Sequence, residues 1–501
     1  MKAFLMYRDH DFELDRDFPV NAPALIQDLE LKTLFNAMAL GDEVLLKVAT
    51  KAVLSGTTDL DTILYRQNIL KDSIRNSAIV RDLYALAVEA IEQRKKTYWG
   101  FLGRPSLYSL IEVLQMYVGM LRKMRAVADE HLEQFESEGL TALLAMLQKE
   151  LSDEYFALIQ KHLAELKFRQ GVLISAELGE GNKGVNYTLH KSIRKKQSWL
   201  ERIFAAKPPV YAYYVHERDE AGSRALAELK NRGINQVINA LAQSTDHIYS
   251  FFAMLRTELA FYIGCLNLYQ GLAQKGEAVT FPLPAGHNEN RLSCSGLYDV
   301  SLAINLEHRI VGNDVNADTK SLIIITGANQ GGKSTFLRSI GLAQLMMQCG
   351  MFVPAGRYCA SVCSGLFSHF KREEDADMNS GKLDEELSRM SHIVDNLSPY
   401  AMVLFNESFA ATNEREGSEI AGQIVGALLE KRIKVCFVTH LYKFAHGRYE
   451  QKLENALYLR AEREINGQRT FKMVQGEPLQ TSYGADLYNQ IFNTDVNPTS
   501  E

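Results

Sequence analysis

The feature that most constrains this chain is an apolar run that leads into a glycine-rich loop. Ser321–Thr326 (SLIIIT) has the composition of a buried β-strand, and Thr335–Met347 has helical spacing. Between them stands the sequence GANQGGKS, residues 327–334. A strand, a glycine-rich loop and a helix in this order predict a P-loop, which binds the phosphates of ATP or GTP.

The residue types in this loop suit a triphosphate. Glycine lacks a Cβ, so Gly327, Gly331 and Gly332 let backbone amides turn inward around phosphate oxygens. Lys333 brings an ammonium group to the phosphates, and Ser334 brings a hydroxyl ligand for Mg²⁺. We therefore expect ATP and Mg²⁺ as ligands. The expected contacts come from Gly327, Ala328, Asn329, Gln330, Gly331, Gly332, Lys333, Ser334 and Thr335.

Two further apolar runs end in polar residues that suit nucleotide hydrolysis. Met402–Phe405 is followed by Asn406 and Glu407, and Val435–Thr439 is followed by His440. Ligands gather at the carboxyl ends of parallel strands, so we expect Glu407 as the base for the attacking water, with His440 and Lys333 as catalytic partners. The alternatives are that Glu407 is a solvent-facing strand end and that His440 is structural.

Asn406 stands where P-loop ATPases carry an acidic residue for the magnesium shell. An amide keeps one acceptor oxygen, which can hold Mg²⁺ through water, but it lacks the negative charge. We therefore expect weaker magnesium binding at Ser334 and Asn406 than in an enzyme with an aspartate.

The amino-terminal half has a different pattern of apolar residues. From about Leu29 to Gln274, apolar residues recur every three to four positions with few prolines, which predicts a helical region and not a sheet. The clearest helix covers Ile234–Leu266, where apolar residues alternate steps of four and three. Such a seam packs lengthwise on another helix. It is either a core helix of a bundle or a lever that carries movement between domains.

After Gly276, short β-rich runs alternate with helical stretches. Glu277–Phe281 and His308–Val311 are two of the predicted strands. The expected fold class is therefore α plus α/β. A helical core and lever region occupies residues 1–275, and an ABC-type P-loop ATPase domain with a mostly parallel sheet occupies residues 276–501.

Composition excludes several other classes. The formal charge of −6 gives no overall attraction to nucleic acid or to a membrane surface. The most apolar long segment, Leu255–Leu272, contains Arg256 and Glu258, so no membrane span is expected. The six cysteines are thinly spread, which favours free thiols in the cytoplasm.

One local segment could still contact DNA. Between His190 and Pro208, six basic residues face a single acidic one, with two aromatic residues interleaved. Basic side chains provide most non-specific affinity for the DNA backbone. The alternative is a solvated helix face. The candidate DNA contacts are Lys191, Arg194, Lys195, Lys196 and Arg202.

These motifs together resemble a known family. Thr326–Ala355 resembles the nucleotide-binding loop and first helix of the MutS family of DNA mismatch-repair ATPases. Val403–Ala421 resembles that family's second strand, Phe437–Ala445 its histidine-bearing strand, and Thr481–Leu487 its late Ser-Tyr-Gly element. The resemblance covers about Gly312 to Asn489.

The resemblance implies a homodimer in which each ATP lies between one subunit's P-loop and a signature helix of the other. The candidate signature residues are Ser380 and Gly381, where the family's Ser-Thr-Phe run is replaced by Ser-Gly-Lys. Asn313 matches a family asparagine near the nucleotide. The helical region leaves no room for the family's mismatch-reading domain, so direct mismatch recognition is not expected.

Two functions follow as hypotheses. The first is a MutS-like ATPase that clamps duplex or branched DNA in mismatch repair or recombination, with a repair protein as a further partner. The second is an ATP-binding switch or scaffold that hardly hydrolyses ATP and recruits a protein without nucleic acid.

Overall fold

The computed structural model describes most of the chain. The described residues are 1–99, 106–168, 171–190, 211, 212, 214–216, 218–372, 381–463 and 469–479. They form two compact units, each of which joins stretches that are distant in sequence. Unit 1 comprises Met1–Ala3, Asp82–Leu132 and Leu143–Arg256, and unit 2 comprises Phe4–Arg81, Glu133–Ala142 and Thr257–Glu501.

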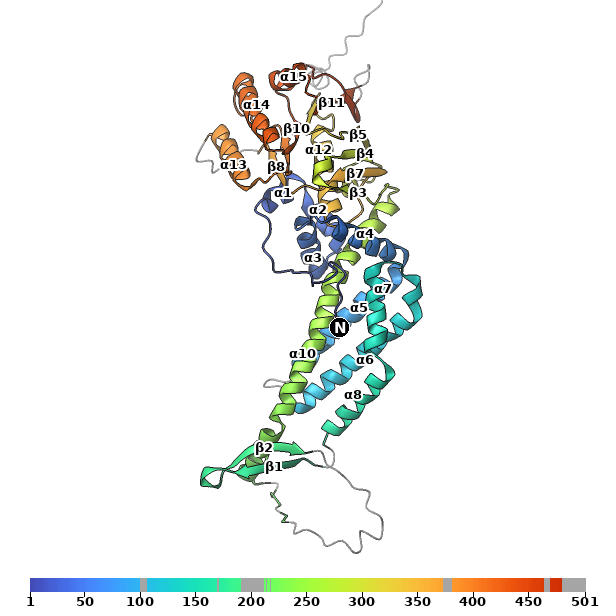
Figure 1. Ribbon diagram of the computed structural model, residues 1–501, viewed down its shortest axis with the longest axis vertical. Coiled ribbons are helices and arrows are strands. Elements are labelled where there is room, and N and C mark those ends of the chain that lie inside the picture. Colours follow the sequence, from blue (N-terminus) through green and yellow to red (C-terminus); the bar gives the residue numbers. More distant parts are fainter. Residues whose placement is uncertain are drawn as a thin grey trace, which may run out of the picture. The chain divides into compact units, whose positions relative to one another are not determined.

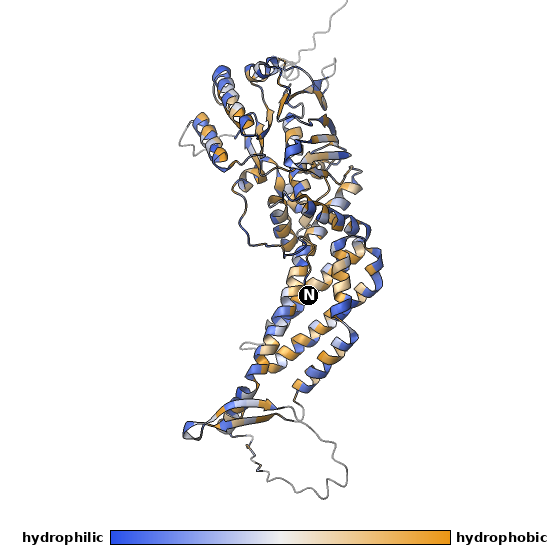
Figure 2. Ribbon diagram, in the orientation of Figure 1, coloured by the Kyte–Doolittle hydropathy of each residue, from blue (hydrophilic) through white to orange (hydrophobic). Residues whose placement is uncertain are grey.

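Unit 1 is mainly helical (Figure 1). Figure 2 shows hydrophobic and hydrophilic residues mixed along its long helices, as expected for helices with one buried face. Its helices are α5 (Ser77–Trp99), α6 (Leu107–His131), α7 (Glu138–Glu150), α8 (Asp153–Leu166) and α10 (Glu220–Gln274), of which α5, α7 and α10 continue into unit 2.

The predicted long helix is confirmed as α10. In unit 1, Leu241 and Ile248 of its seam pack against a buried cluster from α6 and α8. Tyr117 of α6 stacks on Phe252 of α10, with ring centroids 5.6 Å apart. The seam therefore packs lengthwise on neighbouring helices, as its spacing predicts.

A β-hairpin interrupts the helical region, so the prediction of a region without sheet is wrong here. β1 (Leu173–Leu178) pairs antiparallel with β2 (Gly184–His190). The turn between them contains Gly181 at φ 66°, a conformation that glycine adopts without steric cost. Two strands of six or seven residues are too short to outweigh the helical composition of the surrounding sequence.

Unit 2 combines short helices with two sheets. Asp42, Asp59 and Asn413 begin α3, α4 and α14 by accepting hydrogen bonds from first-turn amides. The amino-terminal helices are α1 (Ala22–Asp28), α2 (Leu31–Ala39), α3 (Glu43–Leu54) and α4 (Leu60–Arg75). The later helices are α11 (Val300–Asn305), α12 (Lys333–Gln348), α13 (Lys382–Asn396), α14 (Glu414–Glu430) and α15 (Tyr442–Glu450).

The larger sheet is mostly parallel, as predicted. Its strand order is β12-β11-β6-β10-β9-β8, with β12 antiparallel to β11 and the other neighbours parallel. Helix α12 packs on β9 and β10, and α14 packs on β10 (Figure 1). The strands are β6 (Leu322–Thr326), β8 (Leu366–Phe370), β9 (Met402–Asn406), β10 (Lys434–Val438), β11 (Ala456–Arg463) and β12 (Arg469–Gln475).

A second sheet corrects two predicted strands. It has the order β3-β7-β4-β5, from β3 (Leu283–Ala285), β7 (Arg357–Ser361), β4 (Leu292–Leu297) and β5 (Asn313–Asn316). The strands predicted at 277–281 and 308–311 are wrong. Glu277 instead belongs to the cap of α10, and its carboxylate binds the amide of Ile310. Within 277–281, Thr280 makes an isolated antiparallel bridge to Val353, which is too short for a strand.

Among the described residues, α10 passes a test for a membrane span by length and hydropathy alone. Its apolar window is, however, 78% buried inside the protein. A buried core helix has these same properties.

Candidate functional site

The larger sheet brings three predicted site elements to one edge. β9, β10 and β6 are adjacent and parallel, with Val438 paired to both Asn406 and Ile325. The glycine-rich loop directly follows β6, Glu407 directly follows β9, and His440 lies two residues after the end of β10. The parallel register therefore gathers them at the carboxyl edge of the sheet, where α/β proteins bind ligands.

Glycine is required at two places in the loop. Gly327 has φ 118°, and a Cβ there would lie 2.9 Å from the backbone nitrogen of Ala461. A Cβ on Gly331 would lie 2.7 Å from the Cβ of Ala461. Gln330 at φ 57° and Gly332 at φ 84° add left-handed turns, which favour an anion-binding concavity of backbone amides.

Lys333 is the buried cation of the loop. It is 4% exposed, and its Nζ donates hydrogen bonds to the carbonyl oxygens of Gly327 and Ala328, each at 2.9 Å. Burial lowers the pKa of Lys333 to about 8, against the opposing effect of the Glu407 charge. An anionic phosphate would restore the charged form, because a nearby opposite charge favours it.

Ser334 and Asn406, the two residues predicted to hold magnesium, lie in contact. The Ser334 hydroxyl donates to Oδ1 of Asn406 at 2.7 Å. This donor set is made of neutral oxygens, which fit Mg²⁺ if phosphates and waters complete the shell. In the described part of the chain, no cluster of three or more histidine, cysteine, aspartate or glutamate residues could hold a metal.

Glu407 and His440 form a hydrogen-bonded pair. His440 Nε2 lies 3.1 Å from Oε1 of Glu407, and both side chains are about one-third exposed. The hydrogen bond from His440 is the main cause that lowers the pKa of Glu407, while burial opposes it. Glu407 has φ 53°, an uncommon conformation for a non-glycine residue. The pair can therefore hold and orient a water molecule as an ionised base.

A cavity of about 470 Å³ lies beside the loop. Gln330, Gly332 and Thr335 belong to its lining, together with a set of apolar residues that form an apolar wall. The apolar wall includes Leu302, Leu306, Ile310, Val311 and Phe471. Its volume and mixed lining suit a small ligand that is part polar and part aromatic.

Asn313 lies in the lining of this cavity, and its side chain binds the main chain of β12. Its Nδ2 donates to the carbonyl of Phe471 (3.3 Å), and its Oδ1 accepts from the amide of Met473 (2.7 Å). Asn313 thereby holds Phe471, which is 47% exposed at φ 59°. Sequence reasoning missed Phe471, and only its late position in a β-rich stretch could have signalled it.

Several predicted residues lie elsewhere or outside the described part. Asn329 is exposed, and Gln330 accepts a hydrogen bond from Arg469 at 2.6 Å. Gly381 is the extended residue directly before α13. Ser380 and the DNA-contact candidates Lys191, Arg194, Lys195, Lys196 and Arg202 lie outside the described residues.

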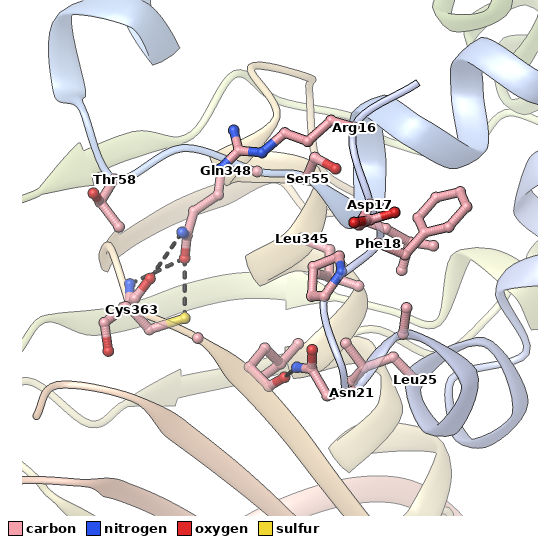
Figure 3. A pocket seen from close by; sticks show the side chains of 17 residues that line it. Arg16, Asp17, Phe18, Asn21, Leu25, Ser55, Thr58, Leu345, Gln348 and Cys363 are labelled. Atoms are coloured by element: carbon pink, nitrogen blue, oxygen red, sulfur yellow. Dashed lines mark hydrogen bonds between the residues drawn. The ribbon is translucent and has the colours of Figure 1, made fainter. Parts of the chain in front are cut away.

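A second cavity, of about 370 Å³, lies at the far end of α12 (Figure 3). Its lining includes Arg16, Asn21, Gln348 and Cys363. Gln348 hydrogen-bonds the amide and the thiol of Cys363, each at 3.0 Å. Burial raises the pKa of the Cys363 thiol to about 12, so the thiol stays protonated and is not a nucleophile.

Two family models match this chain. The MutS2 N-terminal domain matches residues 58–275, and MutS domain V matches residues 323–495. The two matches cover the helical region and the α/β region in the same order as the fold.

Named relatives agree with these matches. An Endonuclease MutS2 of Lacticaseibacillus casei is 30% identical over 49% of this chain and 30% of its own length. A DNA mismatch repair protein MutS of Syntrophomonas wolfei is 27% identical over 66% of this chain and 42% of its own length. MutS protein homolog 4 of Mus musculus is 29% identical over 49% of this chain and 24% of its own length. This chain therefore spans less than half the length of these relatives. Together with the two family models, they show that the chain belongs to the MutS family.

Proposed function

We propose that this chain is a MutS-like ATPase that binds Mg²⁺–ATP at the loop of residues 327–335 and hydrolyses it slowly. The observation that carries the proposal is the meeting of Lys333, the Ser334–Asn406 pair and the Glu407–His440 pair at one sheet edge. A P-loop ATPase needs these groups together. In this proposal the helical core and lever region is residues 1–275, the ATPase domain is residues 276–501, and the protein is cytoplasmic.

Each group has a distinct task. The loop amides and Lys333 bind the phosphate oxygens, and bound Mg²⁺ neutralises the charge that develops on them. Glu407 accepts the proton of the attacking water, and His440 keeps this carboxylate oriented and ionised. Asn406 contributes no charge, so we expect turnover to be slow.

The cavity beside the loop is the proposed site for the nucleotide base. Its apolar wall lies directly next to Gly332 and Thr335, where the triphosphate would end. Phe471 offers an exposed ring that Asn313 holds in place. An aromatic ring of this kind stacks on a purine with a gain of roughly 1–3 kcal/mol.

DNA and a second subunit complete the proposal. Relatives carry the name DNA mismatch repair protein, which favours a nucleic-acid partner. The basic segment that follows β2 contains Lys191, Arg194 and Lys195, which suit a phosphate backbone. We propose that a second copy of the chain supplies Ser380 and Gly381 to the ATP site, so that ATP closes a dimeric clamp.

ATP turnover tests this proposal. We expect slow turnover that duplex, mismatched or branched DNA stimulates, together with DNA affinity that falls as salt rises. Glu407→Gln should retain ATP binding and lower turnover about 100-fold or more, since positioned bases contribute roughly 10²–10⁴. Absence of DNA stimulation and of salt-sensitive DNA binding would instead support an ATP switch without nucleic acid. Full turnover in Glu407→Gln would exclude Glu407 as the base.

A further inference from the structure

Helix α10 ends in a rigid cap next to the proposed nucleotide pocket. Gly276 at φ 70° donates its amide to the carbonyl of Ala273 (3.0 Å), and Glu277 donates its amide to that of Leu272 (3.1 Å). This pair of bonds is a Schellman motif, which fixes the direction of the chain beyond a helix. Lys275 and Glu277 are therefore held in defined positions at the end of α10.

Lys275 binds the carboxyl end of α11. Its Nζ donates to the carbonyl oxygens of Ala303 (2.9 Å), Ile304 (2.6 Å) and Leu306 (2.9 Å). An ammonium group has three donors, and all three are used here. The last carbonyls of a helix lack intrahelical partners and carry partial negative charge, so a cation there is stabilising.

Glu277 binds the segment that follows α11. Its side chain is 8% exposed, and Oε1 accepts a hydrogen bond from the amide of Ile310 at 2.8 Å. A carboxylate with a backbone amide forms a charge-assisted bond, which is stronger than a neutral one. Lys275 and Glu277 thus hold two successive points of the stretch that contains Leu306 and Ile310.

The same stretch forms the apolar wall of the cavity beside the loop. Leu302, Leu306, Ile310 and Val311 all line that cavity, together with Gly332 and Thr335. Lys275 and Glu277 make no hydrogen bond to the described residues of the glycine-rich loop. Their hydrogen bonds therefore reach apolar lining residues of the cavity and not the glycine-rich loop itself.

The amino-terminal end of α11 is attached to the helix that follows the loop. Asp299 caps α11 through the amide of Leu302 (3.0 Å), and it also accepts from Nε of Arg338 in α12 (2.5 Å). The α11 helix is therefore fixed at one end by α12 and at the other end by α10. Ser301 of α11 also donates to the carbonyl of Glu30 (3.3 Å), so removal of the α10 contacts would loosen the carboxyl end of α11 while its other attachments remain.

We infer that Lys275 and Glu277 are positioning residues that set affinity for the base of the bound nucleotide without affecting affinity for its phosphates. They act through the main chain of residues 303–310 and do not touch the ligand. The inference rests on the proposed ATP site and adds that the end of α10 determines base recognition.

Binding of two ligands tests this inference. Affinities for Mg²⁺–ATP and for Mg²⁺–tripolyphosphate, which has no base, are measured by calorimetry on the full chain. Lys275→Met and Glu277→Leu should weaken ATP binding about tenfold and leave tripolyphosphate binding within about twofold. Glu277→Gln keeps an acceptor oxygen for Ile310 and should behave nearly like the wild type. Lys320→Met is the matched control, because Lys320 binds the carbonyl of Glu454 away from the cavity.

The outcomes separate this inference from the proposed function. If Lys275→Met and Glu277→Leu weaken both ligands equally, or neither, the positioning role is wrong. If the wild type binds both ligands with equal affinity, the base contributes nothing and the inference is overturned while the phosphate site stands. If the wild type binds neither ligand, the proposed ATP site itself fails.

Discussion

At the scale of single residues, Lys333 has a property that ligand binding should reveal. Its ammonium group is buried and bonded only to neutral carbonyl oxygens, so its pKa falls to about 8. Phosphate oxygens favour the charged form, so ATP binding above pH 8 requires uptake of a proton. Above pH 8, the ATP-bound protein and the free protein therefore differ in the protonation of Lys333.

This difference predicts a pH-dependent affinity. Above pH 8 the free protein loses the Lys333 proton, so we expect ATP affinity to fall toward tenfold per pH unit. Lys333→Arg should bind ATP with an affinity that changes little between pH 7.5 and 9, because arginine stays protonated. Calorimetric titration in that pH range measures both. A flat profile for the wild type would contradict the proposed role of Lys333.

Asn406 gives a second residue-scale prediction. Asn406→Asp would place a charged oxygen beside the Ser334 hydroxyl, where the amide oxygen now accepts at 2.7 Å. We expect tighter Mg²⁺ binding and turnover about tenfold higher, since charge-assisted bonds are roughly twice as strong as neutral ones. Steady-state turnover across a magnesium titration measures the change. Asn406→Ala, which lacks any acceptor, is the control and should lose activity. An unchanged rate in Asn406→Asp would show that the missing charge does not limit hydrolysis.

At the scale of elements, the amino-terminal segment of unit 2 is bound to α10 through a buried carboxylate. Glu258 accepts hydrogen bonds from the amides of Leu5 and Phe12, the latter at 3.1 Å. Tyr262 on the next turn donates to the carbonyl of Leu5 at 2.6 Å. Burial is the main cause that raises the pKa of Glu258 to about 7, with the charge of Asp11 adding to it.

The raised pKa predicts how stability changes with pH. The protonated carboxyl is favoured in the folded state, so its contribution is full below the unfolded pKa near 4.5 and is lost as pH rises through 7. The loss amounts to about 3 kcal/mol. Glu258→Gln should remove this dependence, while the exposed Glu228→Gln on the same helix should keep it. Melting midpoints at pH 5 and 8 provide the comparison, and equal pH dependence in wild type and Glu258→Gln would contradict it.

Sequence patterns identified the strands that carry the site because those strands are buried on both faces. β6, β9 and β10 contain the apolar runs 322–325, 402–405 and 435–438. The polar residues that follow these runs could therefore be placed at one edge of the sheet before the fold was known. In the segments 277–281 and 308–311, where strands were predicted, Glu277 accepts a hydrogen bond from the amide of Ile310, and Thr280 makes only an isolated bridge to Val353. Local composition does not reveal such a side-chain contact.

The base-side wall of the site could not be predicted for a related reason. Phe471 reaches the cavity because Asn313, 158 residues earlier, binds its carbonyl. Helix α11 lines the cavity because Lys275 and Asp299 hold its two ends. These are contacts between distant segments, and no periodicity or motif marks them.

At the scale of the whole molecule, the proposed DNA contact should appear as a salt dependence. Each neutralised phosphate makes the plot of log affinity against log salt steeper by about 0.9. The alanine variant at Lys191, Arg194, Lys195, Lys196 and Arg202 should therefore give a plot that is less steep by as much as about 4.5. Fluorescence anisotropy with duplex DNA from 50 to 200 mM salt, approximately the range where such contacts dominate, measures it. An unchanged slope would place the DNA contact elsewhere, and an unchanged melting midpoint shows that the variant is folded.

The proposed clamp depends on one claim, that the loop ending in Lys333 and Ser334 binds the triphosphate of ATP. Equilibrium binding of Mg²⁺–ATP to the wild type and to Lys333→Ala tests it most directly. Loss of a buried hydrogen-bonding cation should weaken binding roughly 10- to 150-fold, which corresponds to about 1.5–3 kcal/mol. Equal ATP affinity in the two proteins would contradict the claim.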